Sequence, residues 1–169
     1  MFRFPQRARF GFPEQVNEVS ARLVAAGVVA MCATAVVGRA PWLTVVLAYG
    51  FVARVLTGPK LSPLGQIVTR VIAPRLPFAE KLVPGPPKRF AQGIGAALSV
   101  GAMVAHFAFG ATPLAYVLLC MILVAASLEA ALGFCLGCKA FAMLMRAGVI
   151  APETCEACSD LSVRLRRAA

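Results

Sequence analysis

Charged residues are scarce in this sequence, and acidic residues are the scarcest. Only 14% of the 169 residues are charged and 7 of these are Asp or Glu, whereas 60% are hydrophobic and the mean hydropathy is +0.80. A soluble domain of this length cannot hide so many apolar side chains in its core. The scarcity of charge therefore excludes the soluble classes and makes the lipid bilayer the solvent of most of the chain.

The excess of positive charge does not indicate a nucleic-acid partner. The 17 Lys and Arg residues give a formal net charge of +10. They flank the apolar runs, where such residues orient membrane helices and contact anionic lipid. A nucleic-acid-binding protein would gather them on a polar face. The composition therefore predicts the lipid bilayer, and no nucleic acid, as partner.

Runs with almost no charge predict four membrane spans, near residues 16–38, 41–57, 90–110 and 113–137. In the first two spans the uncharged stretches, residues 23–38 and 40–53, are short for a hydrocarbon core that needs about 20 residues, so they must borrow flanking residues or thin the bilayer. Between the second and third spans, apolar residues recur at helical spacing. They predict an amphipathic helix near 62–74 that is capped by Ser62 and lies on the inner membrane surface.

The expected fold class is thus an all-α integral membrane protein. It is a four-transmembrane-helix bundle with one interfacial helix and a short cytoplasmic Cys-rich tail. The membrane domain covers residues 1–139 and the tail covers residues 140–169.

Charge asymmetry predicts the orientation of the bundle. Lys and Arg precede the first span, lie between the second and third, and follow the fourth, whereas the opposite side has only Arg39. By the positive-inside rule, both termini face the cytoplasm. No pattern of a cleavable signal peptide follows the first apolar run. We therefore expect a multi-pass protein of a cytoplasmic membrane.

Two ionisable residues fall inside the expected spans at similar depth. Arg54 lies near the end of the second span and Glu129 lies in the fourth. An unpaired charge at such a depth is costly, so we expect an Arg54–Glu129 pair, with Arg22 sharing the carboxylate. Six residues of continuous helix would turn Cys135 well away from Glu129. Contact between that carboxylate and the thiol therefore requires a break near Gly133.

Two Cys-x-x-Cys pairs are the strongest functional signal. They are Cys135 with Cys138 and Cys155 with Cys158, and both pairs are expected on the cytoplasmic side. Their separation suits either a four-cysteine zinc site or two dithiol/disulfide couples. In a reducing cytoplasm, permanent structural disulfides are disfavoured. Lys139, next to the first pair, favours a thiolate there, so Cys135 is the candidate attacking group and Cys138 its resolving partner.

These motifs also resemble a known family. The segment 134–139, the Gly-Val-Ile at 148–150, the second Cys pair and the Pro-Glu-Gln-Val-Asn at 13–17 are similar to the bacterial membrane proteins called Domain of Unknown Function 4395. The resemblance implies an inner-membrane domain that carries thiol motifs, and it names no substrate. The setting is similar to that of sulfur-handling systems, whose soluble partners are thioredoxin-like or rhodanese-type proteins.

Three functions stay open at this point. The first is thiol redox or sulfur relay, in which Cys155 and Cys158 form a second couple that exchanges with a soluble thiol protein. The second is a non-enzymatic scaffold in which Cys135, Cys138, Cys155 and Cys158 bind zinc. The third is a transporter of small sulfur species, which the few polar residues in the spans disfavour. The sequence alone does not decide whether the protein is an enzyme.

Overall fold

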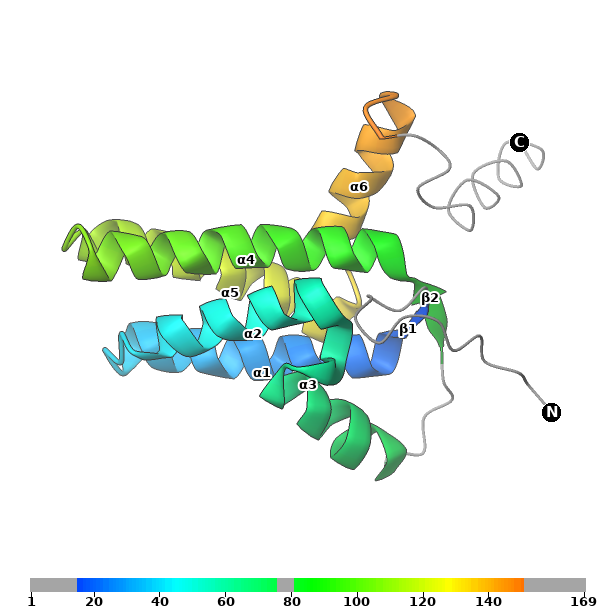
Figure 1. Ribbon diagram of the computed structural model, residues 1–169, viewed down its shortest axis with the longest axis horizontal. Helices are drawn as coiled ribbons and strands as arrows, with labels where there is room; N and C mark the ends of the chain where they lie inside the picture. Colours follow the sequence, from blue (N-terminus) through cyan, green and yellow to red (C-terminus); the bar gives the residue numbers. More distant parts are fainter. Residues whose placement is uncertain (1–14, 76–80, 151–169) are drawn as a thin grey trace.

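The computed structural model describes residues 15–75 and 81–150, which are mostly helical. Four helices form an antiparallel bundle (Figure 1): α1 (Glu18–Val37), α2 (Leu43–Thr57), α4 (Gly85–Phe107) and α5 (Thr112–Leu132). Helix α1 packs mainly on α5, and α2 mainly on α4. The all-α architecture expected from the sequence is confirmed.

Three of these helices, α1, α4 and α5, are long and apolar enough to cross a membrane. This finding agrees with the prediction of a membrane protein. Helix α2 has 15 residues. At a rise of 1.5 Å per residue it extends about 22 Å, which is less than the roughly 30 Å of a hydrocarbon core.

The first hairpin has the bounds that the sequence predicted to within two residues. The side chain of Asn17 caps α1 and accepts a hydrogen bond from the Val19 N–H at 2.9 Å. Helix α1 ends before Gly38 and Arg39, and Arg39 has a positive φ of 48°. This left-handed residue turns the chain into α2.

Helix α4 begins five residues before the expected start of the third span. Gly85 opens the helix and two prolines fill its first turn. Proline fits there because the first amide groups of a helix have no intrahelical acceptor. The earlier start places Lys88 inside the bundle, where it is 8% exposed.

Helix α5 ends at Leu132 and not at the expected residue 137. Gly133 adopts a left-handed conformation with φ of 67°, and its N–H donates to the Glu129 carbonyl at 2.9 Å. This conformation satisfies the last carbonyls of a helix and stops it. A new helix, α6 (Leu136–Arg146), then leaves the bundle at a steep angle (Figure 1).

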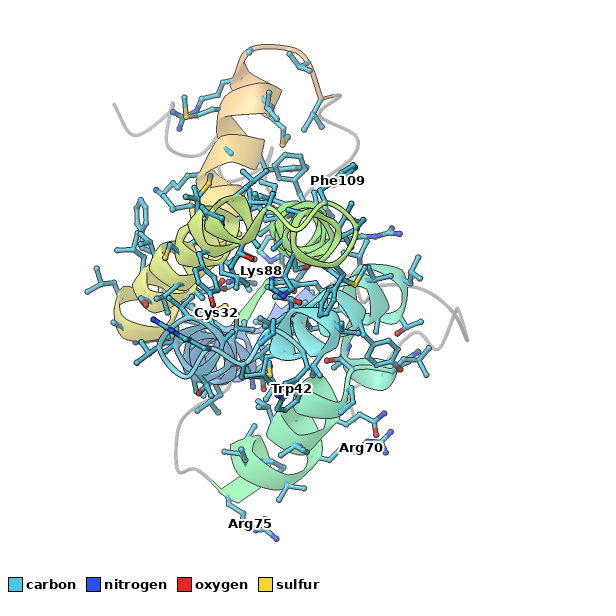
Figure 2. The ribbon with its side chains drawn as sticks, turned by 90° about the vertical axis from the view of Figure 1, so that its left-hand side faces the viewer. Cys32, Trp42, Arg70, Arg75, Lys88 and Phe109 are labelled. Carbon is cyan, nitrogen blue, oxygen red and sulfur yellow. The ribbon has the colours of Figure 1, made fainter. Side chains whose placement is uncertain are left out.

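The helical segment expected near 62–74 is present. Ser62 caps α3 (Pro63–Ile67), which continues through a π-helical turn (Val68–Ile72) and a 3₁₀ turn (Ala73–Arg75). Val68 is 1% exposed and anchors the segment to the bundle. Exposed Ile67, Val71 and Ile72 cover another face. In the end-on view of Figure 2, Arg70 and Arg75 lie out at the edge of the molecule.

A two-stranded antiparallel sheet was not expected. Strand β1 (Gln15–Asn17) pairs with β2 (Leu82–Pro84), with Val16 opposite Val83. The Glu18 N–H then donates to the Lys81 carbonyl at 2.8 Å. The sheet holds together the starts of α1 and α4, and so fixes the end of the bundle where the charged residues gather.

Candidate thiol site

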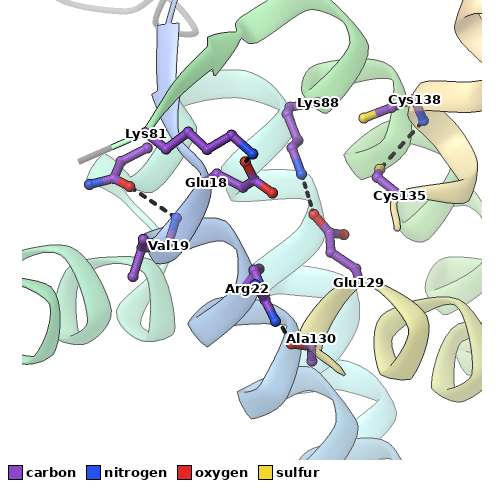
Figure 3. A network of polar contacts seen from close by, with 10 residues as sticks. Glu18, Val19, Arg22, Lys81, Lys88, Glu129, Ala130, Cys135 and Cys138 are labelled. Carbon is purple, nitrogen blue, oxygen red and sulfur yellow. Dashed lines mark hydrogen bonds and ion pairs between the residues drawn. The ribbon is translucent and has the colours of Figure 1, made fainter. Parts of the chain in front are cut away.

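Cys135 and Cys138 lie at the N-terminus of α6. Cys135 is the N-cap residue, and its Sγ accepts a hydrogen bond from the Cys138 N–H at 3.4 Å (Figure 3). Cys135 is buried and Cys138 is half-buried. The unpaired N–H groups and the positive dipole end of an 11-residue helix therefore face the first thiol.

The two thiols have opposite acidities. The pKa of Cys135 is lowered, mainly by a hydrogen bond from the Cys138 side chain and further by the positive charge of Lys88, against burial and the charge of Glu129. The pKa of Cys138 is raised by the Cys135 side chain and by burial. The pair therefore favours one thiolate, on Cys135, and one thiol, on Cys138.

Close packing of α6 on α4 holds the pair in place. A Cβ on Gly137 would lie 2.5 Å from Ala91 Cβ and 2.6 Å from Ala91 Cα, so only glycine fits between the helices. One turn further along α6, the Phe141 ring lies 5.6 Å from the ring of Phe90. These contacts place both thiols beside the first two turns of α4.

A buried ion pair lies next to the thiols. Lys88 Nζ on α4 donates to Glu129 Oε1 on α5 at 2.5 Å, and the two side chains are 10% and 15% exposed. Figure 3 shows this pair between the first turn of α1 and the Cys pair. Because Gly133 ends α5, Glu129 lies close enough to Cys135 to affect its pKa. The break near Gly133 is the one that the sequence required for contact between these two residues.

The expected Arg54–Glu129 pair is not formed. Lys88, which the longer α4 brings into the bundle, takes the carboxylate, and the Arg54 guanidinium lies over the Phe51 ring at 4.5 Å. Arg22 does not share Glu129 either. Its Nε and Nη2 donate to the Ala130 and Ala131 carbonyls, at 3.1 and 2.7 Å. Arg22 thus caps the C-terminus of α5, where a cation is favourable.

Sequence reasoning missed Lys88, which it counted only among the orienting charges. The available signal was the Pro-Pro pair at 86–87, since prolines are common in the first turn of a helix. Reading that pair as a helix start would have placed Lys88 in the span. Reasoning from the sequence also missed the ion pair of Glu18 with Lys81, whose charged atoms are 2.8 Å apart.

The second Cys pair, Cys155 with Cys158, lies outside the described residues. Across residues 15–75 and 81–150, no three His, Cys, Asp or Glu side chains gather as metal ligands. The described part of the chain therefore supplies two of the four proposed zinc ligands. The zinc prediction stays a prediction.

Comparison with known proteins places most of the chain in one family. The model of the family described as Domain of unknown function (DUF4395) matches residues 16–146. This range includes the whole bundle, the ion pair and the first Cys pair. No curated protein and no solved structure matches the chain.

Proposed function

The chain belongs to the DUF4395 family, and from this premise we propose that it is a bacterial inner-membrane protein that carries out thiol redox or sulfur relay at the cytoplasmic face. The observation that carries the proposal is the asymmetric pair at the start of α6. Cys135 is the acidic thiol that caps the helix, and Cys138 is the less acidic thiol held beside it. A nucleophile and a resolving thiol need this difference.

The membrane arrangement that we propose has four spans, with α2 as the fourth. Helix α2 is short, but it exposes apolar side chains along one side, as a lipid-facing helix does: Val45, Val46, Tyr49, Val52 and Leu56. An even number of spans keeps both termini on the cytoplasmic side, in agreement with the distribution of Lys and Arg. The Cys pair then lies at the inner surface, within reach of soluble proteins.

The proposed redox step is a thiol–disulfide exchange. The Cys135 thiolate attacks one sulfur of a substrate disulfide, the substrate S–S bond breaks, and the leaving thiolate takes a proton from water. Cys138 then loses its proton to water and attacks Cys135 Sγ, which releases the second substrate thiolate. The substrate disulfide is reduced by two electrons, and the Cys135–Cys138 dithiol is oxidised to a disulfide.

A sulfur relay would use the same nucleophile. The Cys135 thiolate attacks the outer sulfur of a protein persulfide, R–S–SH, the S–S bond breaks, and R–S⁻ leaves with a persulfide formed on Cys135. In either case, we assign regeneration to the dithiol of Cys155 and Cys158, which exchanges with a soluble thioredoxin-like or rhodanese-type protein. Lys88 stabilises the thiolate from the α4 side of the site.

Alkylation of the reduced full-length protein in lipid discs tests this function. With iodoacetamide as probe and mass spectrometry as readout, Cys135 should react at lower pH than Cys138. Cys120→Ser, which removes an exposed thiol of α5, is the control and should leave the profile unchanged. After mild oxidation, a Cys135–Cys138 disulfide should form, with a potential in the thioredoxin range, about −270 mV.

The zinc scaffold gives the opposite result. It predicts about one zinc per chain, thiols that resist alkylation until a chelator is added, and loss of the metal from each Cys→Ser variant of the four. Stoichiometric zinc that survives mild oxidant, with no disulfide in the mass spectrum, would overturn the redox proposal.

A further inference from the structure

Arg54 is a buried cation with free hydrogen-bond donors. The residue lies in the last turn of α2 and is 5% exposed. Its Nε and Nη1 atoms are buried and have no hydrogen-bond partner among the residues that the structure describes. A buried guanidinium without an acceptor is costly, because burial removes the water that would otherwise bind it.

Packing prevents Arg54 from reaching out to water. The guanidinium stacks on the Phe51 ring at 4.5 Å, and that ring presses on α4 at Gly95, where an added Cβ would lie 2.3 Å from it. A long Arg side chain near a helix end ordinarily extends toward the membrane surface. Here the aromatic ring and the glycine hold it in the bundle.

The negative charge of the described residues is already paired. The part of the chain that the structure describes contains two carboxylates, Glu18 and Glu129, and each is paired with a lysine. Glu129 lies within electrostatic reach of Arg54. Within the described part of the chain, Lys88, Glu129 and Arg54 together therefore leave one positive charge uncompensated inside the bundle.

A free acceptor lies at the same level of the bundle. Gln92 follows Lys88 by one turn of α4, and its Oε1 is buried without a partner in the described residues. The register of α2 and α4 puts Gln92 level with Arg54, because the Arg89 Nε donates to the Val55 carbonyl at 3.1 Å and Phe51 faces Gly95. Unused buried donors on α2 and an unused buried acceptor on α4 thus lie at the same level of the bundle.

We propose that Arg54 and Gln92 form a binding site for a small oxyanion that carries a proton, such as dihydrogen phosphate. The anionic oxygens accept from Arg54 and neutralise the excess charge, with Lys88 adding to the positive field. The protonated oxygen donates to Gln92 Oε1. Sulfate has the same shape but no proton to donate, so the buried acceptor selects against it. The site does not involve the thiols.

A lipid phosphate is the second source of this chemistry. A phosphodiester headgroup offers anionic oxygens to Arg54 but no protonated phosphate oxygen to Gln92. The donor to Gln92 therefore assigns the site to a free phosphate or a phosphate monoester, and the experiment separates the two sources by using a membrane without anionic lipid.

The test is thermal unfolding of the full-length protein in phosphatidylcholine discs at pH 6 with added inorganic phosphate or sulfate. At 100 times its dissociation constant, phosphate should raise the melting temperature by roughly 5 to 10 °C. Sulfate should need at least tenfold higher concentration. Arg54→Gln should abolish the shift, whereas Arg70→Gln, an exposed arginine outside the bundle, should keep it. Gln92→Leu should equalise the two anions.

Three results would overturn the proposal. They are equal effects of both anions on the wild type, an undiminished shift in Arg54→Gln, and stabilisation only by discs that contain phosphatidylglycerol. If Arg54→Gln does not fold, equilibrium dialysis of labelled phosphate against wild type and Gln92→Leu decides, and no binding to the wild type refutes the site. Cys135→Ser should retain phosphate binding, so failure of the thiol function leaves this result intact.

Discussion

Removing either partner of the Lys88–Glu129 pair should destabilise the bundle, and the two single changes should differ in size. Breaking a buried ion pair costs about 3–5 kcal/mol, and the partial exposure of both side chains places this pair near the lower value. Glu129→Gln leaves Lys88 without its partner and removes the nearby negative charge from Arg54, so we expect a loss of about 3 kcal/mol. Lys88→Met should cost less, since Arg54 is near enough to become the new partner of Glu129.

The same two variants should move the acidity of Cys135 in opposite directions. Lys88 lowers the pKa of this thiol and Glu129 raises it, so Lys88→Met should raise the pKa and Glu129→Gln should lower it. A general loosening of the fold would change both in one direction. Lys81→Met is the matched control, because its ion pair with Glu18 is 73% exposed on the lysine side and is worth about 1 kcal/mol or less.

Unfolding in mixed micelles measures the stabilities, and the pH dependence of Cys135 alkylation, followed by mass spectrometry, measures the thiol. The double variant Lys88→Met/Glu129→Leu leaves Arg54 unchanged and should be more stable than Glu129→Gln alone. If Glu129→Gln is no less stable than Lys88→Met, or if both shift the thiol the same way, the assigned pairing and its effect on Cys135 are wrong.

Two further predictions test the packing and the orientation. Gly137→Ala should push α6 away from α4 and lower the stability by about 1–3 kcal/mol. Gly93→Ala, whose added methyl group meets open space, should be neutral or stabilising by up to about 1 kcal/mol. Thermal unfolding of both variants measures the difference. Maleimide reagents that cannot cross membranes should label Cys155 and Cys158 in inverted vesicles and not in intact cells. Labelling in intact cells would reverse the proposed orientation.

The sequence predicted the cysteines of the thiol site but not the ion pair beside them. The motif identified Cys135 and Cys138, and the αL glycine explains why the pair lies at a helix start and not inside a span. The partner of Glu129 was wrong because the sequence gives the depth of a charge along its own helix only. Which cation reaches the carboxylate depends on where α4 begins, which the Pro-Pro pair at 86–87 signals locally, and on how the four helices pack, which only the tertiary structure shows.

The sequence by itself determined that the protein is helical and has helices long and apolar enough to cross a membrane, because composition and the length of apolar runs decide how backbone and side chains partition between water and lipid. It also determined the bounds of the first hairpin to within two residues, because caps, prolines and glycines act locally. Only the tertiary structure decided that Lys88 takes Glu129, that Arg22 caps α5, and that Arg54 and Gln92 keep free polar atoms. These outcomes depend on contacts between residues far apart in the chain, and no local pattern encodes them.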